Sequence, residues 1–216
     1  MVTQKAYTVG EEILNSIAHG IGELLAVASL TLLVTLASIY GNSWSIVSCA
    51  IFGATMMLMY GASTLYHAVP SERAKKYLKK FDHIAIYYFI AGSYTPFLLV
   101  LIRGAWGWSL FGCVWALALL GTYLKLALPV NGTKKWSILL YLGMGWLIVV
   151  ALKIVVAQVT TTGLVFLSLG GAFYTLGILF YIWKSRRYTH AVWHFFVLLG
   201  SLMHVLAVLF SCVFLT

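Results

Sequence analysis

The sequence contains few charged residues and very few acidic ones. Charged side chains make up 9% of the 216 residues, five residues are acidic, and hydrophobic residues reach 62%. With a mean hydropathy of +0.96, the chain has too few polar side chains to cover a water-soluble globule. The composition therefore predicts an integral membrane protein.

Cysteine is also scarce. Cys49, Cys113 and Cys212 each fall in a different apolar run, and none belongs to a C-x-x-C pair. We interpret them as small core residues and not as disulfide partners or metal ligands. The sequence shows no low-complexity tract and no convincing internal repeat, so we expect one domain over residues 1–216.

Long apolar runs account for most of the chain. A hydrocarbon core about 30 Å thick needs roughly 20 apolar residues per helix. Seven such runs are separated by charged or Gly/Pro-containing segments, and they cover approximately residues 13–40, 44–68, 82–102, 106–128, 136–157, 161–183 and 190–214. We expect an all-α, polytopic membrane protein, a seven-transmembrane helix bundle.

The apolar runs favour helices over a transmembrane β-barrel. A run such as GELLAVASLTLLVTLASIY is apolar on every side, whereas barrel strands alternate in polarity over about 10 residues. The first run follows VGEEILNS without an A-x-A-like cleavage site. We expect this run to stay in the protein as a signal anchor.

Lysine and arginine are distributed unequally between the two sides of the predicted membrane. Arg103 and Lys153 fall on one side, whereas twelve fall on the side of the amino terminus. The twelve are Lys5, Arg73, Lys75, Lys76, Lys79, Lys80, Lys125, Lys134, Lys135, Lys184, Arg186 and Arg187. The positive-inside rule predicts a cytoplasmic N-terminus and a C-terminus outside. We attribute the net charge of +9 to this topology and to anionic lipid, and we expect no nucleic-acid partner.

Polar and ionisable residues from four predicted helices converge on one level, the cytoplasmic end. They are Glu12, Asn15 and His19 on one face of the first helix, Ser63 and His67 at the end of the second, Asp82 at the start of the third, and His190 and His194 at the start of the seventh. Ionisable groups inside a bilayer are costly enough to indicate function.

Zinc binding is the chemistry that best suits this set. A catalytic zinc site uses three protein ligands and leaves a fourth position for water. His190 and His194 offer two ligands from one helix face, and His67 offers the third at matching depth. Asp82 is placed to hydrogen-bond the zinc-bound water and to take its proton, with Ser63 one turn from His67. We expect a hydrolytic centre in which Asp82 and Ser63 are catalytic.

Glu12, Asn15 and His19 are expected to support this centre structurally, from outside the ligand set. One turn deeper on the first helix, Glu23 is predicted to form a buried hydrogen-bonded pair with His19. His204 lies ten residues beyond His194, about 15 Å along the helix, too far to join the same site. We interpret His204 as a buried polar contact.

Each motif also has a simpler interpretation. An isolated H-x-x-x-H in a membrane helix is more often an interhelical hydrogen-bonding pair. Ser63 can bond its own helix backbone, and His67 can sit at the membrane interface. Asp82 can act as an N-terminal helix residue that complements the helix dipole.

The motifs EEILNSIAHGIG, ASTLYHAVP, KKFDHIAIYYFIAGSYTPF and HAVWH resemble the bacterial hemolysin III branch of the progestin and adipoQ receptor family, over nearly the whole chain. The resemblance implies zinc near the cytoplasmic face, held by His67, His190 and His194, with Asp82 contacting the zinc-bound water. It implies kinship with alkaline ceramidases, a membrane lipid or fatty-acyl ligand, and a multi-pass location in the bacterial cytoplasmic (inner) membrane.

Three functions follow as hypotheses. The first is a zinc-dependent hydrolase of a lipid amide or ester bond, similar to a ceramidase. The second is a receptor-like sensor of membrane homeostasis with structural zinc, and the third is a cytolytic (hemolysin) activity, which the seven permanently apolar runs argue against. Transport is not favoured, because no predicted span is interrupted mid-membrane by Gly or Pro, Pro96 being the nearest candidate.

Overall fold

The computed structural model describes residues 7–128, 134–183 and 186–214. These residues contain no strand, and seven of their helical segments are long and apolar enough to cross a membrane. The elements are α1 (Val9–Tyr40), α2 (Ser43–Ala68), α3 (Glu72–Pro96), the π-helix η1 (Phe97–Leu101), α4 (Ala105–Ala127), α5 (Lys134–Gly145), the 3-10 helix η2 (Leu147–Ala151), α6 (Leu152–Gln158), α7 (Thr161–Ile182), α8 (Thr189–Val208) and the π-helix η3 (Leu209–Val213). The predicted seven-helix membrane fold is confirmed.

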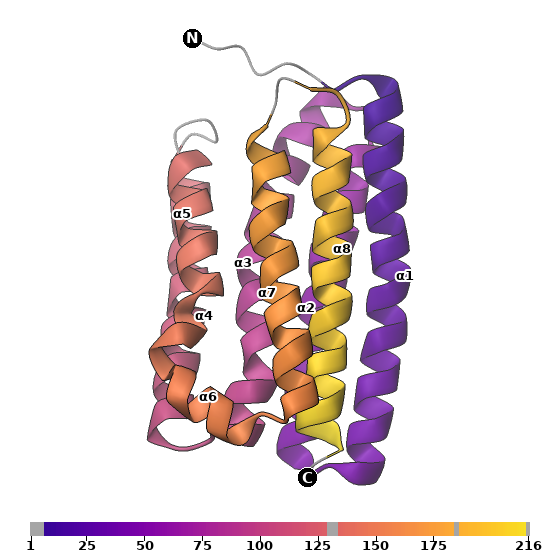
Figure 1. Ribbon diagram of the computed structural model, residues 1–216. Coiled ribbons are helices and arrows are strands. Elements are labelled where there is room, and N and C mark those ends of the chain that lie inside the picture. Colours follow the sequence, from indigo (N-terminus) through magenta and orange to yellow (C-terminus); the bar gives the residue numbers. More distant parts are fainter. Residues whose placement is uncertain (1–6, 129–133, 184–185, 215–216) are drawn as a thin grey trace.

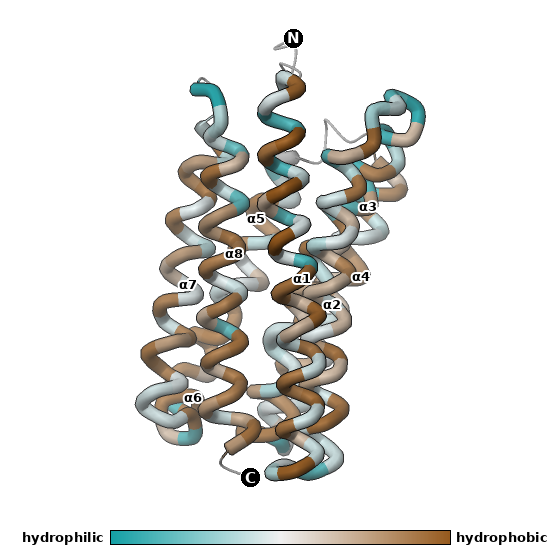
Figure 2. Tube along the Cα trace, turned by 90° about the vertical axis from the view of Figure 1, so that its right-hand side faces the viewer, coloured by the Kyte–Doolittle hydropathy of each residue, from teal (hydrophilic) through white to brown (hydrophobic). Residues whose placement is uncertain are grey.

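The helices form one elongated bundle with the two chain termini at opposite ends (Figure 1). Apolar residues dominate the middle of the bundle, and hydrophilic segments gather toward its ends (Figure 2). Lys5, Lys184 and the side chain of Lys134, which contribute to the predicted charge asymmetry, lie outside the described residues.

Side-chain caps fix where the first two helices begin. The Thr8 hydroxyl accepts a hydrogen bond from the Glu11 backbone N–H at 3.3 Å, and the Glu11 carboxylate accepts one from the Thr8 backbone at 2.9 Å. This reciprocal capping box satisfies N–H groups that the helix itself leaves unpaired. At the start of α2, the Asn42 side chain accepts hydrogen bonds from the backbone of Trp44 and Ser45.

Helix α3 begins earlier than the apolar run predicts, at Glu72 and not at residue 82. The Ser71 hydroxyl caps it by accepting a hydrogen bond from the Ala74 backbone at 3.4 Å. The charged segment continues the helix because lysine, arginine and glutamate are good helix formers. Asp82 therefore lies almost three turns inside α3. The interpretation that Asp82 opens the helix and complements its dipole is wrong.

The fifth span is interrupted, a feature that the apolar run over residues 136–157 does not reveal. Helix α5 ends at Gly145, and η2 and α6 complete the crossing. The hydroxyl of Tyr94 lies 2.8 Å from the carbonyl oxygens of both Met144 and Gly145, and it accepts a hydrogen bond from the Ile148 backbone at 3.0 Å. A side chain from α3 thus replaces helical hydrogen bonds that the break removes. In Figure 1, α6 lies at the end of the bundle opposite the amino terminus.

Small residues let the first three helices pack closely. A Cβ added at Gly22 of α1 would overlap the Tyr60 ring of α2, and one added at Gly92 of α3 would overlap Thr55 of α2. Close backbone approach of this kind is how membrane helices associate, since lipid gives them little hydrophobic drive. The packing places the amino-terminal turns of α1 beside the last turns of α2.

A buried hydrogen-bond network ties α2 to α7 and α8. The Tyr60 hydroxyl donates to Ser201 Oγ at 2.7 Å, and the Tyr174 hydroxyl lies 3.0 Å from the same oxygen. Nearby, His204 Nδ1 lies 3.0 Å from the Gly200 carbonyl oxygen of its own helix. The predicted polar contact of His204 is thus present, but the side chain is half-buried and not fully buried as predicted. The contacts of Tyr60 and Tyr174 with Ser201 hold α8 in a defined position against α2 and α7.

Candidate metal centre

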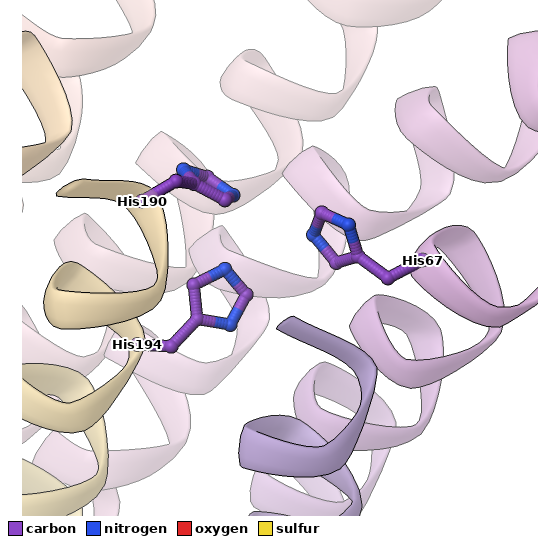
Figure 3. Close-up of side chains that lie close together, drawn as sticks. All are labelled: His67, His190 and His194. Atoms are coloured by element: carbon purple, nitrogen blue, oxygen red, sulfur yellow. The ribbon is translucent and has the colours of Figure 1, made fainter. Parts of the chain in front are cut away.

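Three histidines from two helices come together near the amino-terminal end of the bundle (Figure 3). His67 lies in the last turn of α2, and His190 and His194 lie in the first turns of α8. One ring nitrogen from each can be chosen so that all lie within 4.8 Å of one another. These three residues can therefore hold one metal ion.

The start of α8 is built so that His190 and His194 both face α2. The spacing i, i+4 places them on one helix face. The loop before α8 turns through Tyr188, a non-glycine residue in the left-handed region with φ 63°, and the Thr189 hydroxyl donates to the Trp183 carbonyl at 2.7 Å. The Tyr188 backbone N–H donates to Glu11 of α1 at 3.1 Å. These contacts fix the first turn of α8 against α1.

His67 and His194 are buried and have ring nitrogens without a hydrogen-bond partner among the described residues. His67 is 3% exposed and His194 is 0% exposed. Within the described ranges, His67 Nε2 and both ring nitrogens of His194 have no hydrogen-bond partner. Each unpaired buried polar group costs about 1–3 kcal/mol. A cation shared by these nitrogens would remove that cost, and a set of imidazoles suits a transition-metal ion.

Glu12 holds His67 from the side away from the cluster. Glu12 Oε2 lies 2.5 Å from His67 Nδ1, and Glu12 Oε1 accepts a hydrogen bond from Lys75 Nζ at 2.5 Å. An ionised carboxylate is only an acceptor, so His67 Nδ1 carries the proton and Nε2 keeps its lone pair for a metal. This is the carboxylate–histidine arrangement that commonly supports metal ligands.

Asn15 and His19 continue the same face of α1 beneath Glu12. They are 0% and 1% exposed, and none of their side-chain nitrogen or oxygen atoms has a hydrogen-bond partner within the described part of the chain. The His19 ring centroid lies 3.7 Å from that of His194. The predicted hydrogen bond between His19 and Glu23 is wrong, because His19 turns toward α8 and Glu23 lies against the Gly61 backbone.

Asp82 and Ser63 are brought together beside the histidines. Asp82 of α3 is 9% exposed, and Ser63 of α2 donates a hydrogen bond to its carboxylate. Asp82 also interacts electrostatically with His67 and with Lys125, a residue that sequence reasoning did not single out. Lys125 is 2% exposed in the last turn of α4. A lysine so deeply buried could have been suspected from its place within the apolar run 106–128.

Tyr7 also lies at the histidine cluster, although no pattern in the sequence indicated this position. Its ring stacks on His190 with centroids 4.9 Å apart and planes 25° apart, and it lies 6.0 Å from the ring of His67. Burial raises the pKa of the Tyr7 phenol, so this ring stays neutral. Tyr7 precedes the first apolar run, and only its position in space connects it with the histidines.

Comparison with known proteins gives consistent matches over nearly the whole chain. The family model described as Haemolysin-III related matches residues 7–205, a range that contains all of the site residues. The chain is 45% identical over 207 residues to the Hemolysin-3 homolog of Bacillus subtilis (strain 168), covering 96% of this chain and 97% of that protein. It is 41% identical over 209 residues to the Hemolysin-3 of Bacillus cereus, covering 97% and 95%. The monocyte to macrophage differentiation factor of Homo sapiens is 29% identical over 177 residues, covering 77% and 71%.

Proposed function

This chain belongs to the haemolysin III-related family, and we propose that it is a zinc-dependent hydrolase of a lipid amide or ester bond, built as one membrane domain over residues 1–216. Membership agrees with the motif-based resemblance to the hemolysin III branch of the progestin and adipoQ receptor family. The observation that carries the proposal is the buried three-histidine cluster with Asp82 and Ser63 beside it.

Zinc is the ion that we propose for this cluster. His67, His190 and His194 would hold it and leave one position open, the ligand number typical of catalytic zinc sites. A zinc ion supplies Lewis acidity and lowers the pKa of a bound water toward ~7. Glu12 would keep His67 in the tautomer that presents Nε2 to the ion.

Asp82 is the proton acceptor in this proposal. The Ser63 hydroxyl donates to its carboxylate, which limits the rotation of the side chain and leaves further lone pairs for a second donor. The electrostatic interaction between Asp82 and His67 supports this role. Asp82 would take a proton from the attacking water and return it to the leaving group of the substrate.

A lipid or fatty-acyl substrate fits the surroundings of the site. The histidines are carried by helices whose outer faces are apolar, so a membrane lipid can approach sideways from the bilayer. We propose that this end faces the cytoplasm of a bacterial cell, with the carboxyl terminus outside the cytoplasmic membrane. The excess of lysine and arginine on this side supports the orientation.

The test is turnover of a broad lipid panel by purified protein with stoichiometric zinc. We expect hydrolysis of at least one amide or ester lipid, and a loss of about 10²–10⁴-fold in the Asp82→Asn variant, because that variant lacks the proton acceptor. Zinc content should be equal in the two proteins. A zinc-loaded wild-type protein that hydrolyses no lipid in the panel would refute the hydrolase.

A structural role for the metal is the second candidate. An ion held by His67 of α2 and by two histidines of α8 would join helices that are far apart in the sequence. A membrane-homeostasis sensor of this kind would keep both its metal and its signalling in the Asp82→Asn variant. A cytolytic activity, suggested by the name of the Bacillus cereus relative, has less support because all seven spans are permanently apolar.

A further inference from the structure

A groove lies beside the histidine cluster, at the first turns of α1. It has a volume of about 410 Å³ and extends to the junction of α2 with α3. Ile13 and Ile17 line one part of it, Glu72 and Lys75 line another, and Glu12 and His67 are among the residues that line it from the metal centre. The groove therefore combines an apolar wall, a charged rim and a contact with a proposed metal ligand.

The groove opens where phospholipid headgroups meet acyl chains. The 32 residues of α1 span about 48 Å, well beyond a hydrocarbon core of about 30 Å. Glu11 and Glu12 lie in its first turn, where charged side chains disfavour the hydrocarbon core, so we expect the first turns of α1 to extend to the level of the headgroups. Ile13 and Ile17 are each 54% exposed and face outward from the bundle, as expected for side chains in contact with lipid.

The chemistry of the lining suits an amphiphile that carries charges of both signs. Glu72 and Lys75 are three residues apart on α3 and offer opposite charges on neighbouring positions of the helix surface. Lys75 donates one hydrogen bond to Glu12, and an ammonium group has three donors. The Lys75 ammonium can therefore bind a phosphate oxygen as well, while the exposed Glu72 carboxylate can bind a cationic group.

We propose that this groove binds a phospholipid with a zwitterionic headgroup, its phosphate on Lys75, its ammonium on Glu72 and an acyl chain along Ile13 and Ile17. The bound lipid is not the substrate. It would meet His67 on the side of Nδ1, which Glu12 occupies, whereas Nε2 is the nitrogen available to the metal.

The bound lipid would influence the metal centre through Glu12. A phosphate on Lys75 competes with Glu12 for the Lys75 ammonium, and Glu12 is the group that holds His67. Lipid binding and metal binding are then linked, and each ligand changes the affinity of the other by the same factor. This coupling rests on the proposed metal site but requires no hydrolysis.

The first experiment measures binding of a fluorescent phosphatidylethanolamine to metal-free protein in detergent micelles. Ile17→Trp fills the groove and should weaken binding about tenfold or more, because the indole occupies space in which the acyl chain would be buried. Ile21→Trp is the matched control: Ile21 is 50% exposed one turn further along the same face and does not line the groove. Equal affinity of wild type and Ile17→Trp would overturn the site.

The headgroup assignment is tested on the same preparation. Lys75→Gln should weaken binding of both phosphatidylethanolamine and phosphatidylglycerol, because both carry the phosphate. Glu72→Gln should remove the preference for phosphatidylethanolamine, and Lys76→Gln, an exposed neighbour outside the groove, should change nothing. Wild-type protein that binds phosphatidylglycerol as tightly as phosphatidylethanolamine would overturn the zwitterionic assignment.

The coupling is tested by zinc affinity, measured by chelator competition with and without saturating phosphatidylethanolamine. We expect a several-fold change in the zinc Kd of the wild type and no change in Ile17→Trp, whose metal ligands are intact. A wild-type zinc Kd that is independent of the lipid would overturn the coupling. Lipid binding by metal-free protein is independent of turnover, so failure of the hydrolase proposal and failure of this one are distinguishable.

Discussion

The imidazoles of His19 and His194 contact each other across the boundary between α1 and α8, with ring centroids 3.7 Å apart and ring planes tilted by 53°. His19 belongs to a helix that contributes no residue to the three-histidine cluster. The same helix carries Glu12, whose carboxylate lies 2.5 Å from His67. One face of α1 thus contacts two of the three candidate ligands and determines how their rings are oriented.

Replacement of His19 should weaken metal binding without abolishing it. The His19→Ala variant leaves a gap beside His194, and loss of such an outer contact typically lowers metal affinity by about 10–100-fold. Chelator competition measures the effect, and His19→Gln should lose less affinity than His19→Ala because the glutamine side chain fills part of the same space beside His194. The control is His204→Ala, whose histidine bonds the Gly200 carbonyl further along α8. Equal zinc affinity in His19→Ala and wild type would contradict this role.

The zinc content of purified variants distinguishes residues that bind the metal from residues that only lie near it. Elemental analysis of detergent-purified wild type should give about one zinc per chain, as expected for a single site with three protein ligands. His194→Ala should lose the metal, because His194 supplies one of the three nitrogens, and Asp82→Ala should keep it. If the wild type held no zinc even after reconstitution, these histidines would be helix-packing residues.

Two glycines of α1 should respond oppositely to alanine. A Cβ at Gly22 would overlap the Tyr60 ring, so Gly22→Ala should push α1 from α2 and destabilise the protein by about 1–3 kcal/mol. Nothing lies within 4 Å of a Cβ at Gly20. Gly20→Ala should be neutral or stabilising by up to about 1 kcal/mol, because alanine favours the helix. Thermal unfolding in detergent compares the two variants, and an equal Tm for both would contradict the close contact.

The orientation predicts which engineered cysteines are accessible from outside the cell. In a variant whose three natural cysteines are alanine, Trp106→Cys should react with a membrane-impermeant thiol reagent in intact cells. Tyr77→Cys should react only after permeabilisation, since it lies among the basic residues that we propose face the cytoplasm. Both parent residues are exposed, at 51% and 67%. The reverse labelling pattern would show that the bundle is inverted.

The features that the sequence predicted well depend on short segments of the chain, through the length of each apolar run and the spacing of residues along a helix. Seven helices follow from the lengths of the apolar runs, and the predicted run over residues 44–68 matches α2 (Ser43–Ala68) to within one residue. The approach of His190 to His194 follows from helical spacing alone. Their meeting with His67 was predictable because helices of alternating direction bring particular ends to the same level.

Other features depend on how the helices are rotated about their axes, which a single sequence does not reveal. The partner of Glu12 is His67, and His19 turns to His194 and not to Glu23. Tyr94 supports the break in the fifth span through contacts with residues about 50 positions away. The position of Tyr7 over His190 likewise arises only from tertiary packing.

The distribution of the ligands along the chain has a consequence for biosynthesis. His67 leaves the ribosome with the second span, but its two partners belong to the last one. A growing chain cannot assemble the cluster until α8 has been translated and inserted beside α1 and α2. Capture of the proposed metal would therefore be a late event in the life of the nascent chain, and a loaded ion would mark a bundle whose seven crossings are complete.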